Sequence, residues 1–174
     1  MTILQNLING ISIGSVYAII ALGYTMVYGI AKMLNFAHGD IIMVGAYAIL
    51  STMALMGHAI PAIIVAVVVC TLLGLLTERV AYRPLRGASP LAVLITAIGV
   101  SYLLQSLAQI IFGSAPKMVT VYEFGAVKFL GVTVQVSSLV TLAVTVAVMV
   151  ALPMFVKYTR TGRAMVAVSE DRGA

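Results

Sequence analysis

Tryptophan is absent from this 174-residue chain, cysteine occurs once, and charge is scarce. Ten Lys or Arg and five Asp or Glu residues carry all the formal charge, 9% of the chain, whereas 62% of the residues are hydrophobic. A soluble domain has about a quarter charged residues, so too few are present here to cover an apolar core. The single Cys70 excludes an intrachain disulfide and argues against a metal site. Without tryptophan, an interfacial aromatic belt depends on tyrosines.

Four long stretches contain no charged side chain. A helix of about 20 apolar residues crosses the hydrocarbon core of a bilayer. Each stretch is long enough for one span, and residues 41–77 are long enough for two. The pattern therefore predicts an all-α fold, a polytopic transmembrane helix bundle with five spans in this chain. The stretches are 1–31, 41–77, 87–116 and 129–156.

Local signals divide these stretches. Gly57 and Pro61 interrupt a helix that would otherwise be too long. Ser89 followed by Pro90 is typical of a helix start, with serine as the cap and proline in the first turn. The expected membrane domain, 1–156, has spans at about 11–31, 36–56, 60–77, 90–112 and 135–156, an outer loop at 113–134, and a cytosolic segment at 157–174 after it.

The outer loop contains two runs rich in β-branched residues. Val119–Tyr122 and Val132–Val136 flank Gly125. Such runs favour strands, so we expect a short hairpin on the outer face.

Orientation follows from the distribution of Lys and Arg, which are enriched in cytoplasmic loops. With five spans, eight of these residues fall on one side and two on the other, so the N-terminus is expected outside and residue 174 inside. The larger set is Lys32, Arg79, Arg83, Arg86, Lys157, Arg160, Arg163 and Arg172; the smaller is Lys117 and Lys128.

Sequence motifs argue against an enzyme. No glycine-rich loop ends in Gly-Lys-Ser or Gly-Lys-Thr, so nucleotide phosphates have no such cradle. No catalytic residue, resident cofactor, metal site or nucleic-acid partner is expected.

An intramembrane protease using His38 and a serine stays a minor alternative. A secondary transporter or channel, and a scaffold packed through Gly10, Gly14 and Ala18, are two other classes that the residues leave open.

The most polar short segment near the apolar zone is Asn35-Phe36-Ala37-His38-Gly39-Asp40. In one interpretation, Asn35 and Asp40 satisfy backbone groups where one helix stops and the next begins. In the other, the backbone is broken and lines a solute path, because non-helical backbone at membrane depth is tolerated only inside protein or along a cavity.

The tail after the last span mixes apolar and charged residues. Ala164–Val168 is expected to form a short helix, and Ser169–Arg172 is mostly charged. Docking to a soluble partner and simple solvation are both compatible with this composition.

Several of these stretches together resemble one family. Asn35–Asp40 followed by Gly45-Ala46-Tyr47 resembles the hallmark of the branched-chain amino-acid ABC transporter permeases, the Liv type. Glu78–Arg86 is similar to the loop after the third span in that family. Thr161–Met165, leading into Ser169–Asp171, resembles the approach to its cytosolic coupling loop.

This resemblance implies a permease subunit of an ATP-driven importer of leucine, isoleucine or valine in the bacterial plasma membrane. The implied partners are membrane lipid, a second homologous permease, an extracytoplasmic binding protein, and two ATPase subunits that use ATP and Mg. A permease for another small solute, such as urea or amides, is the alternative. The resemblance also implies about eight spans, so the chain is expected to be an N-terminal fragment.

The resemblance also implies site residues. Asn35, Phe36, His38, Gly39 and Asp40 are expected near the substrate path or its gate. One departure from the family is Val166, where relatives often carry arginine. The residues expected to couple the permease to the ATPase are Gly162, Arg163, Glu170, Asp171, Gly173 and Ala174.

Overall fold

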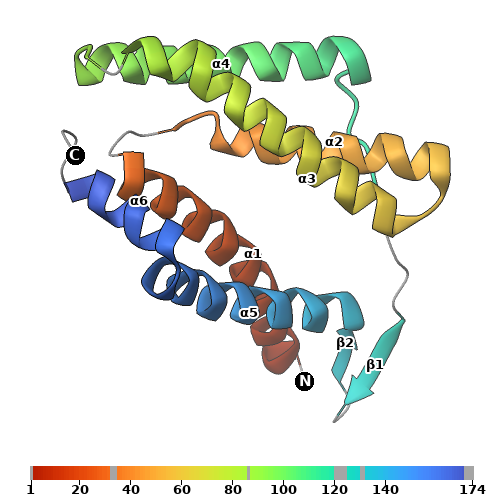
Figure 1. The fold of residues 1–174 in the computed structure, drawn as a ribbon. Helices are drawn as coiled ribbons and strands as arrows, with labels where there is room; N and C mark the ends of the chain where they lie inside the picture. Colours follow the sequence, from red (N-terminus) through yellow and green to blue (C-terminus); the bar gives the residue numbers. More distant parts are fainter. Residues whose placement is uncertain (1, 32–34, 86, 120–124, 130–131, 171–174) are drawn as a thin grey trace. The chain divides into compact units, whose positions relative to one another are not determined.

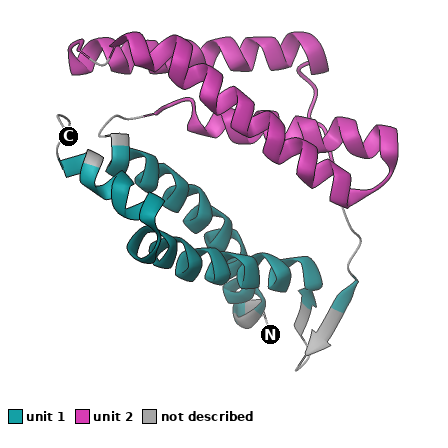
Figure 2. Ribbon diagram, viewed as in Figure 1, with its two compact units in different colours: residues 1–32, 123–174 teal, residues 33–122 magenta. Residues whose placement is uncertain are grey.

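A computed structural model describes residues 2–31, 35–85, 87–119, 125–129 and 132–170 (Figure 1). Within this part of the chain, five helices are long and apolar enough to cross a membrane, which confirms the predicted class. The helices fall into two compact units (Figure 2), residues 1–32 with 123–174, and residues 33–122.

The first unit pairs the beginning of the chain with its end. It contains helices α1 (Thr2–Ala31), α5 (Val136–Tyr158) and α6 (Arg160–Glu170), and an antiparallel hairpin of β1 (Ala126–Phe129) and β2 (Val132–Gln135). Thr145 on α5 is almost fully buried, and its hydroxyl lies 3.3 Å from the Ser15 carbonyl of α1 and 2.7 Å from that of Thr141. This polar contact joins α1 to α5.

The second unit contains α2 (His38–Met56), α3 (Ala59–Thr77) and α4 (Pro90–Phe112). The helix of α3 continues through a π turn, Glu78–Tyr82, and a 3₁₀ turn, Arg83–Leu85. The predicted breaks are present. Gly57 ends α2 in the left-handed conformation, with φ 67°, and the Ser89 side chain caps α4 with Pro90 in its first turn.

Helices α2 and α3 approach closely where a glycine faces a cysteine. A Cβ on Gly45 would lie 2.7 Å from Cys70 Sγ. The Cys70 thiol in turn lies 3.4 Å from the Ile41 carbonyl of α2. Cys70 is therefore a packing residue in the α2–α3 contact.

Small side chains make most of the tight packing. Among the described residues, no large side chain falls below 2% exposure, while many large aliphatic side chains on the helices are exposed. In lipid, association between helices depends on close approach through small residues, because lipid chains are as apolar as leucine. The alanines that are buried are Ala37, Ala59, Ala62, Ala66, Ala97 and Ala108.

The element bounds differ from the expected spans at two places. Helix α1 begins at Thr2, ahead of the expected start of the first span at residue 11, and α3 continues into the Glu78–Leu85 segment. Because a helix satisfies its own backbone N–H and C=O groups, it can be longer than the segment needed to cross the hydrocarbon layer. The membrane boundaries themselves stay predictions.

The predicted hairpin is confirmed for its second strand and wrong for its first. Strand β2 covers Val132–Gln135, as expected, but its partner β1 is Ala126–Phe129, which follows Gly125 instead of preceding it. Register explains the difference, since an antiparallel partner joined by a short turn must lie directly before β2. Val119 belongs to no strand, and residues 120–122 lie outside the described part of the chain.

Candidate functional site

The Asn35 side chain stabilises the turn that precedes α2. Its Oδ1 accepts hydrogen bonds from the Ala37 backbone N–H at 3.1 Å and from the Tyr82 hydroxyl at 2.8 Å. The Asn35 carbonyl also accepts from the His38 N–H at 3.2 Å. Asparagine commonly stabilises a turn in this way. Asn35 thus makes a local turn and a long-range contact at once.

Asp40 lies in the first turn of α2 and is only 8% exposed. Its Oδ1 accepts a hydrogen bond from Gln105 Nε2 of α4 at 3.0 Å. The same Nε2 lies 3.1 Å from Ser101 Oγ, to which it donates its other hydrogen. This hydrogen bond of the Asp40 carboxylate is therefore a contact between helices and does not cap α2.

Tyr82 connects the segment before α2 to the turn that follows α3. It lies in the π turn after α3, is 8% exposed, and packs with Val93 and Ala97 of α4 in the hydrophobic core of the unit. Its ring is thus fixed by apolar contacts while its hydroxyl reaches Asn35. We call Asn35, Asp40, Tyr82, Ser101 and Gln105 the polar cluster.

The other residues predicted for the path share this segment in different environments. Phe36 and Gly39 are exposed, and His38, the first residue of α2, is partly buried. Ala37, between them, has no exposed surface. The structure therefore brings Asn35 and Asp40 into the polar cluster, while Phe36 and Gly39 are exposed.

Three members of the polar cluster were not expected from sequence. Ser101 and Gln105 stand four residues apart in an apolar helix, a spacing that places two side chains on one helix face. This spacing could have been used to predict that the two polar side chains lie together. Tyr82 gave no such signal, because a tyrosine near the end of a span is also typical of an interfacial belt.

The turn between α5 and α6 depends on Thr159 and Gly162. Thr159 Oγ1 accepts the Gly162 backbone N–H at 2.9 Å and caps α6, and it lies 2.6 Å from the Phe155 carbonyl. A Cβ on Gly162 would lie 2.5 Å from the backbone of Val156. Only glycine allows this approach, so Gly162 sets the direction in which α6 leaves α5.

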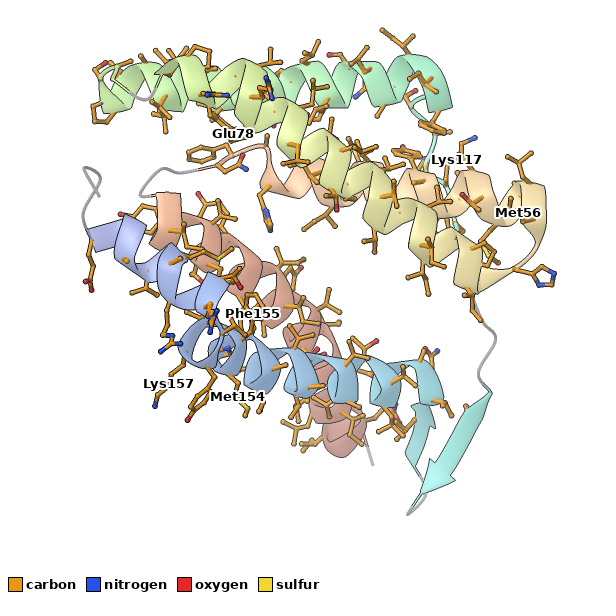
Figure 3. All side chains as sticks on the ribbon, viewed as in Figure 1. Met56, Glu78, Lys117, Met154, Phe155 and Lys157 are labelled. Carbon is orange, nitrogen blue, oxygen red and sulfur yellow. The ribbon has the colours of Figure 1, made fainter. Side chains whose placement is uncertain are left out.

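The remaining residues predicted for coupling lie on α6 or after it. Arg163 and Glu170 are exposed, as are Met165 and Val166. Figure 3 shows Phe155 and Lys157 near the end of α5, where this turn begins. Asp171, Gly173 and Ala174 lie outside the described residues.

Metal binding has no support in the described part of the chain, where no group of three His, Cys, Asp or Glu side chains is placed to hold an ion. What the polar cluster does offer is a carboxylate, two amides and two hydroxyls among apolar helices. These groups can bind a polar or charged group of a solute and cannot by themselves supply a nucleophile with an adjacent base.

Comparison with known proteins gives a consistent family. Residues 6–174 match the family described as branched-chain amino acid transport system / permease component. The chain is 40% identical to the high-affinity branched-chain amino acid transport system permease protein BraD of Pseudomonas aeruginosa. It is 38% identical to the corresponding LivH proteins of Escherichia coli and Salmonella typhimurium.

Each of these alignments covers 97% of this chain and 59% of the relative, so the chain spans somewhat more than half the length of the relatives that it matches. No solved structure matches the chain.

Replacing Tyr82 with phenylalanine tests the contact between the two motif segments. Tyr82→Phe keeps the ring in its apolar site and removes the hydroxyl bound to Asn35. We expect a loss of about 1 kcal/mol of stability, the value of one hydrogen bond, measured as a lower thermal midpoint of the purified protein in detergent. The matched control is Tyr102→Phe, since Tyr102 is 66% exposed. Equal midpoints for the two variants would contradict the contact.

Replacing Gly162 with alanine tests the α5–α6 turn. The added Cβ must displace the backbone of Val156 or of α6, so we expect a destabilisation of about 1–3 kcal/mol. Limited digestion with trypsin is the measurement, because Arg160 and Arg163 lie at this turn. Cleavage there is expected to become several-fold faster. Gly99→Ala is the control, since a Cβ on Gly99 has open space; equal rates would show that the close approach is wrong.

Proposed function

Because the chain belongs to the family of branched-chain amino-acid transport permease components, we propose that it acts as a membrane-spanning subunit of an ATP-driven importer for leucine, isoleucine and valine. The observation that carries this proposal is the family match over residues 6–174 of a chain with five apolar helices. Its relatives are named as permease proteins for these amino acids.

The polar cluster is the part of this chain that we assign to the translocation path. Ionisable residues within membrane-spanning helices are rare, face the interior of a bundle or a water-filled cavity, and mark substrate routes. Asp40 is buried and bonded to another helix. Asn35 stabilises the turn that precedes α2. Phe36 lies in that turn, and His38 and Gly39 begin α2.

The energy source in this proposal is external to the chain. Two ATPase subunits use ATP and Mg, a second permease completes the path, and a binding protein outside the cell delivers the substrate. We assign α6 to the contact with the ATPase, because it exposes Met165 and Val166 beside charged residues, and Gly162 sets its direction. A mixed apolar and charged surface suits a protein interface.

The proposed location is the bacterial plasma membrane, with the N-terminus outside and α6 in the cytoplasm. This orientation rests on the excess of Lys and Arg in the connections that carry Arg83 and Arg160. The membrane domain, 1–156, and the cytosolic segment, 157–174, follow from it.

Reconstitution tests the function. The full-length importer, with both permeases, the ATPase subunits and the binding protein, is placed in vesicles, and uptake of labelled leucine is measured. We expect uptake to need ATP, the ATPase and the binding protein. Asp40→Ala is expected to lower uptake about tenfold or more, with a smaller loss of protein in the membrane. Leucine uptake with no ATPase or binding protein present would contradict the proposal.

Cysteine labelling tests the orientation. Cys70 is replaced by alanine, and single cysteines are placed at Arg83, Arg160 and Lys117. In intact cells, a membrane-impermeant maleimide should label position 117 and spare positions 83 and 160 until the membrane is opened. Labelling of position 83 or 160 from outside would overturn the orientation, and with it the docking role of α6.

A further inference from the structure

Helices α2 and α4 run parallel and in register. Asp40 lies 3.0 Å from Gln105, and the Tyr47 ring stacks on Phe112 with centroids 4.2 Å apart and planes 11° from parallel. From the first contact to the second, each helix advances by seven residues, which is two turns. The two contacts therefore fix one alignment of α2 along α4.

This alignment gives the depth of the polar cluster. Helix α4 begins at Pro90, fifteen residues before Gln105, whereas α2 begins at His38, two residues before Asp40. At 1.5 Å per residue, α2 starts about 20 Å along α4. Figure 1 shows the same arrangement, with α2 beginning part-way along α4 and extending past its far end. Gln105 lies about 22 Å from the Pro90 end of α4 and about 10 Å from its Phe112 end. With α4 as a membrane span, as its length and composition indicate, Asp40 lies inside the apolar layer.

A carboxylate at that depth is costly unless it is compensated. Insertion scales assign about 3 kcal/mol to an aspartate at the centre of a membrane helix. Its partner on α4 is a neutral amide, which compensates a negative charge less than a cation does. The amide is itself held by Ser101, so the direction of the hydrogen bond to Asp40 is set by two residues of one helix face.

We propose that Gln105 is a positioning residue that holds the Asp40 carboxylate to receive the ammonium group of the substrate amino acid, about two thirds of the way along α4. This inference rests on the proposed function. An ionised carboxylate accepts hydrogen bonds at both oxygens. Gln105 engages Oδ1, and an ammonium group forms charge-assisted hydrogen bonds with a carboxylate that are about twice as strong as neutral ones. The substrate then supplies the positive charge that the neutral amide lacks.

The test uses the full-length importer with all its partners and compares three variants. Asp40→Asn keeps an oxygen acceptor for Gln105 and removes the charge. Gln105→Leu removes the donor at similar volume, and Gln109→Leu is the matched control, one turn further along α4 and exposed. We expect leucine uptake per permease in the membrane to fall about tenfold or more for Asp40→Asn, to fall about three- to tenfold for Gln105→Leu, and to stay within about twofold for Gln109→Leu.

Two further readouts separate positioning of a charge from a structural role. If Gln105 acts through the Asp40 charge, adding Gln105→Leu to Asp40→Asn causes no further loss, whereas independent structural damage adds. The second readout is 2-hydroxy-4-methylpentanoate, which carries a hydroxyl in place of the ammonium group of leucine. With the binding protein saturated by either compound, the preference of the wild type for leucine should collapse in Asp40→Asn.

The outcomes are distinguishable. Wild-type uptake rates for Asp40→Asn, additive losses in the double variant, or an unchanged preference for leucine over the hydroxy acid would overturn this inference and leave the proposed function standing. A wild-type importer that fails to take up leucine in an ATP-dependent way would overturn the proposed function itself, and the inference with it.

Discussion

The structure depends above all on the need of every backbone N–H and C=O group in lipid for a partner within the protein. Helices meet that need within one segment, and an open sheet does not. The described residues accordingly include five long apolar helices, with Gly57 ending one and the Ser89 side chain capping another. Because burial of large aliphatic groups is not a driving force between helices in lipid, the contacts are made by alanine, glycine and single hydroxyl or thiol groups, as at Gly45 and Cys70.

The polar cluster includes one of the described segments in which the backbone is not helical. The chain is not helical at Asn35, where the Asn35 side chain accepts the Ala37 backbone N–H that has no helical partner. The Tyr82 hydroxyl donates to the same Asn35 oxygen. A break of this kind is tolerated inside protein or along a cavity. Asp40 follows this break and meets Gln105 about two thirds of the way along α4. In the proposed function, its carboxylate gives the break a chemical use that a simple connection between helices lacks.

The sequence predicts the helices well because charge and apolar length are local properties. Ser89 and Gly57 mark helix ends for the same reason. What it does not predict depends on register between distant segments. Gln105 meets Asp40 only because α2 and α4 align over a separation of 65 residues, and β1 lies after Gly125 because pairing with β2 decides its position. The roles assigned to Phe36, His38 and Arg163 rest on family resemblance.

The pairing of α1 with α5 has a consequence for biogenesis. The hydroxyl of Thr145 bonds to the carbonyl of Ser15, 130 residues earlier, while α2 and α3 are joined by a tight turn and meet at once. At a synthesis rate of about 5–20 residues per second, roughly ten seconds separate the emergence of α1 from the ribosome from that of its partner. During that interval α1 must contact lipid or the insertion machinery instead of α5. A nascent chain that stops before α5 leaves α1 without this helix partner.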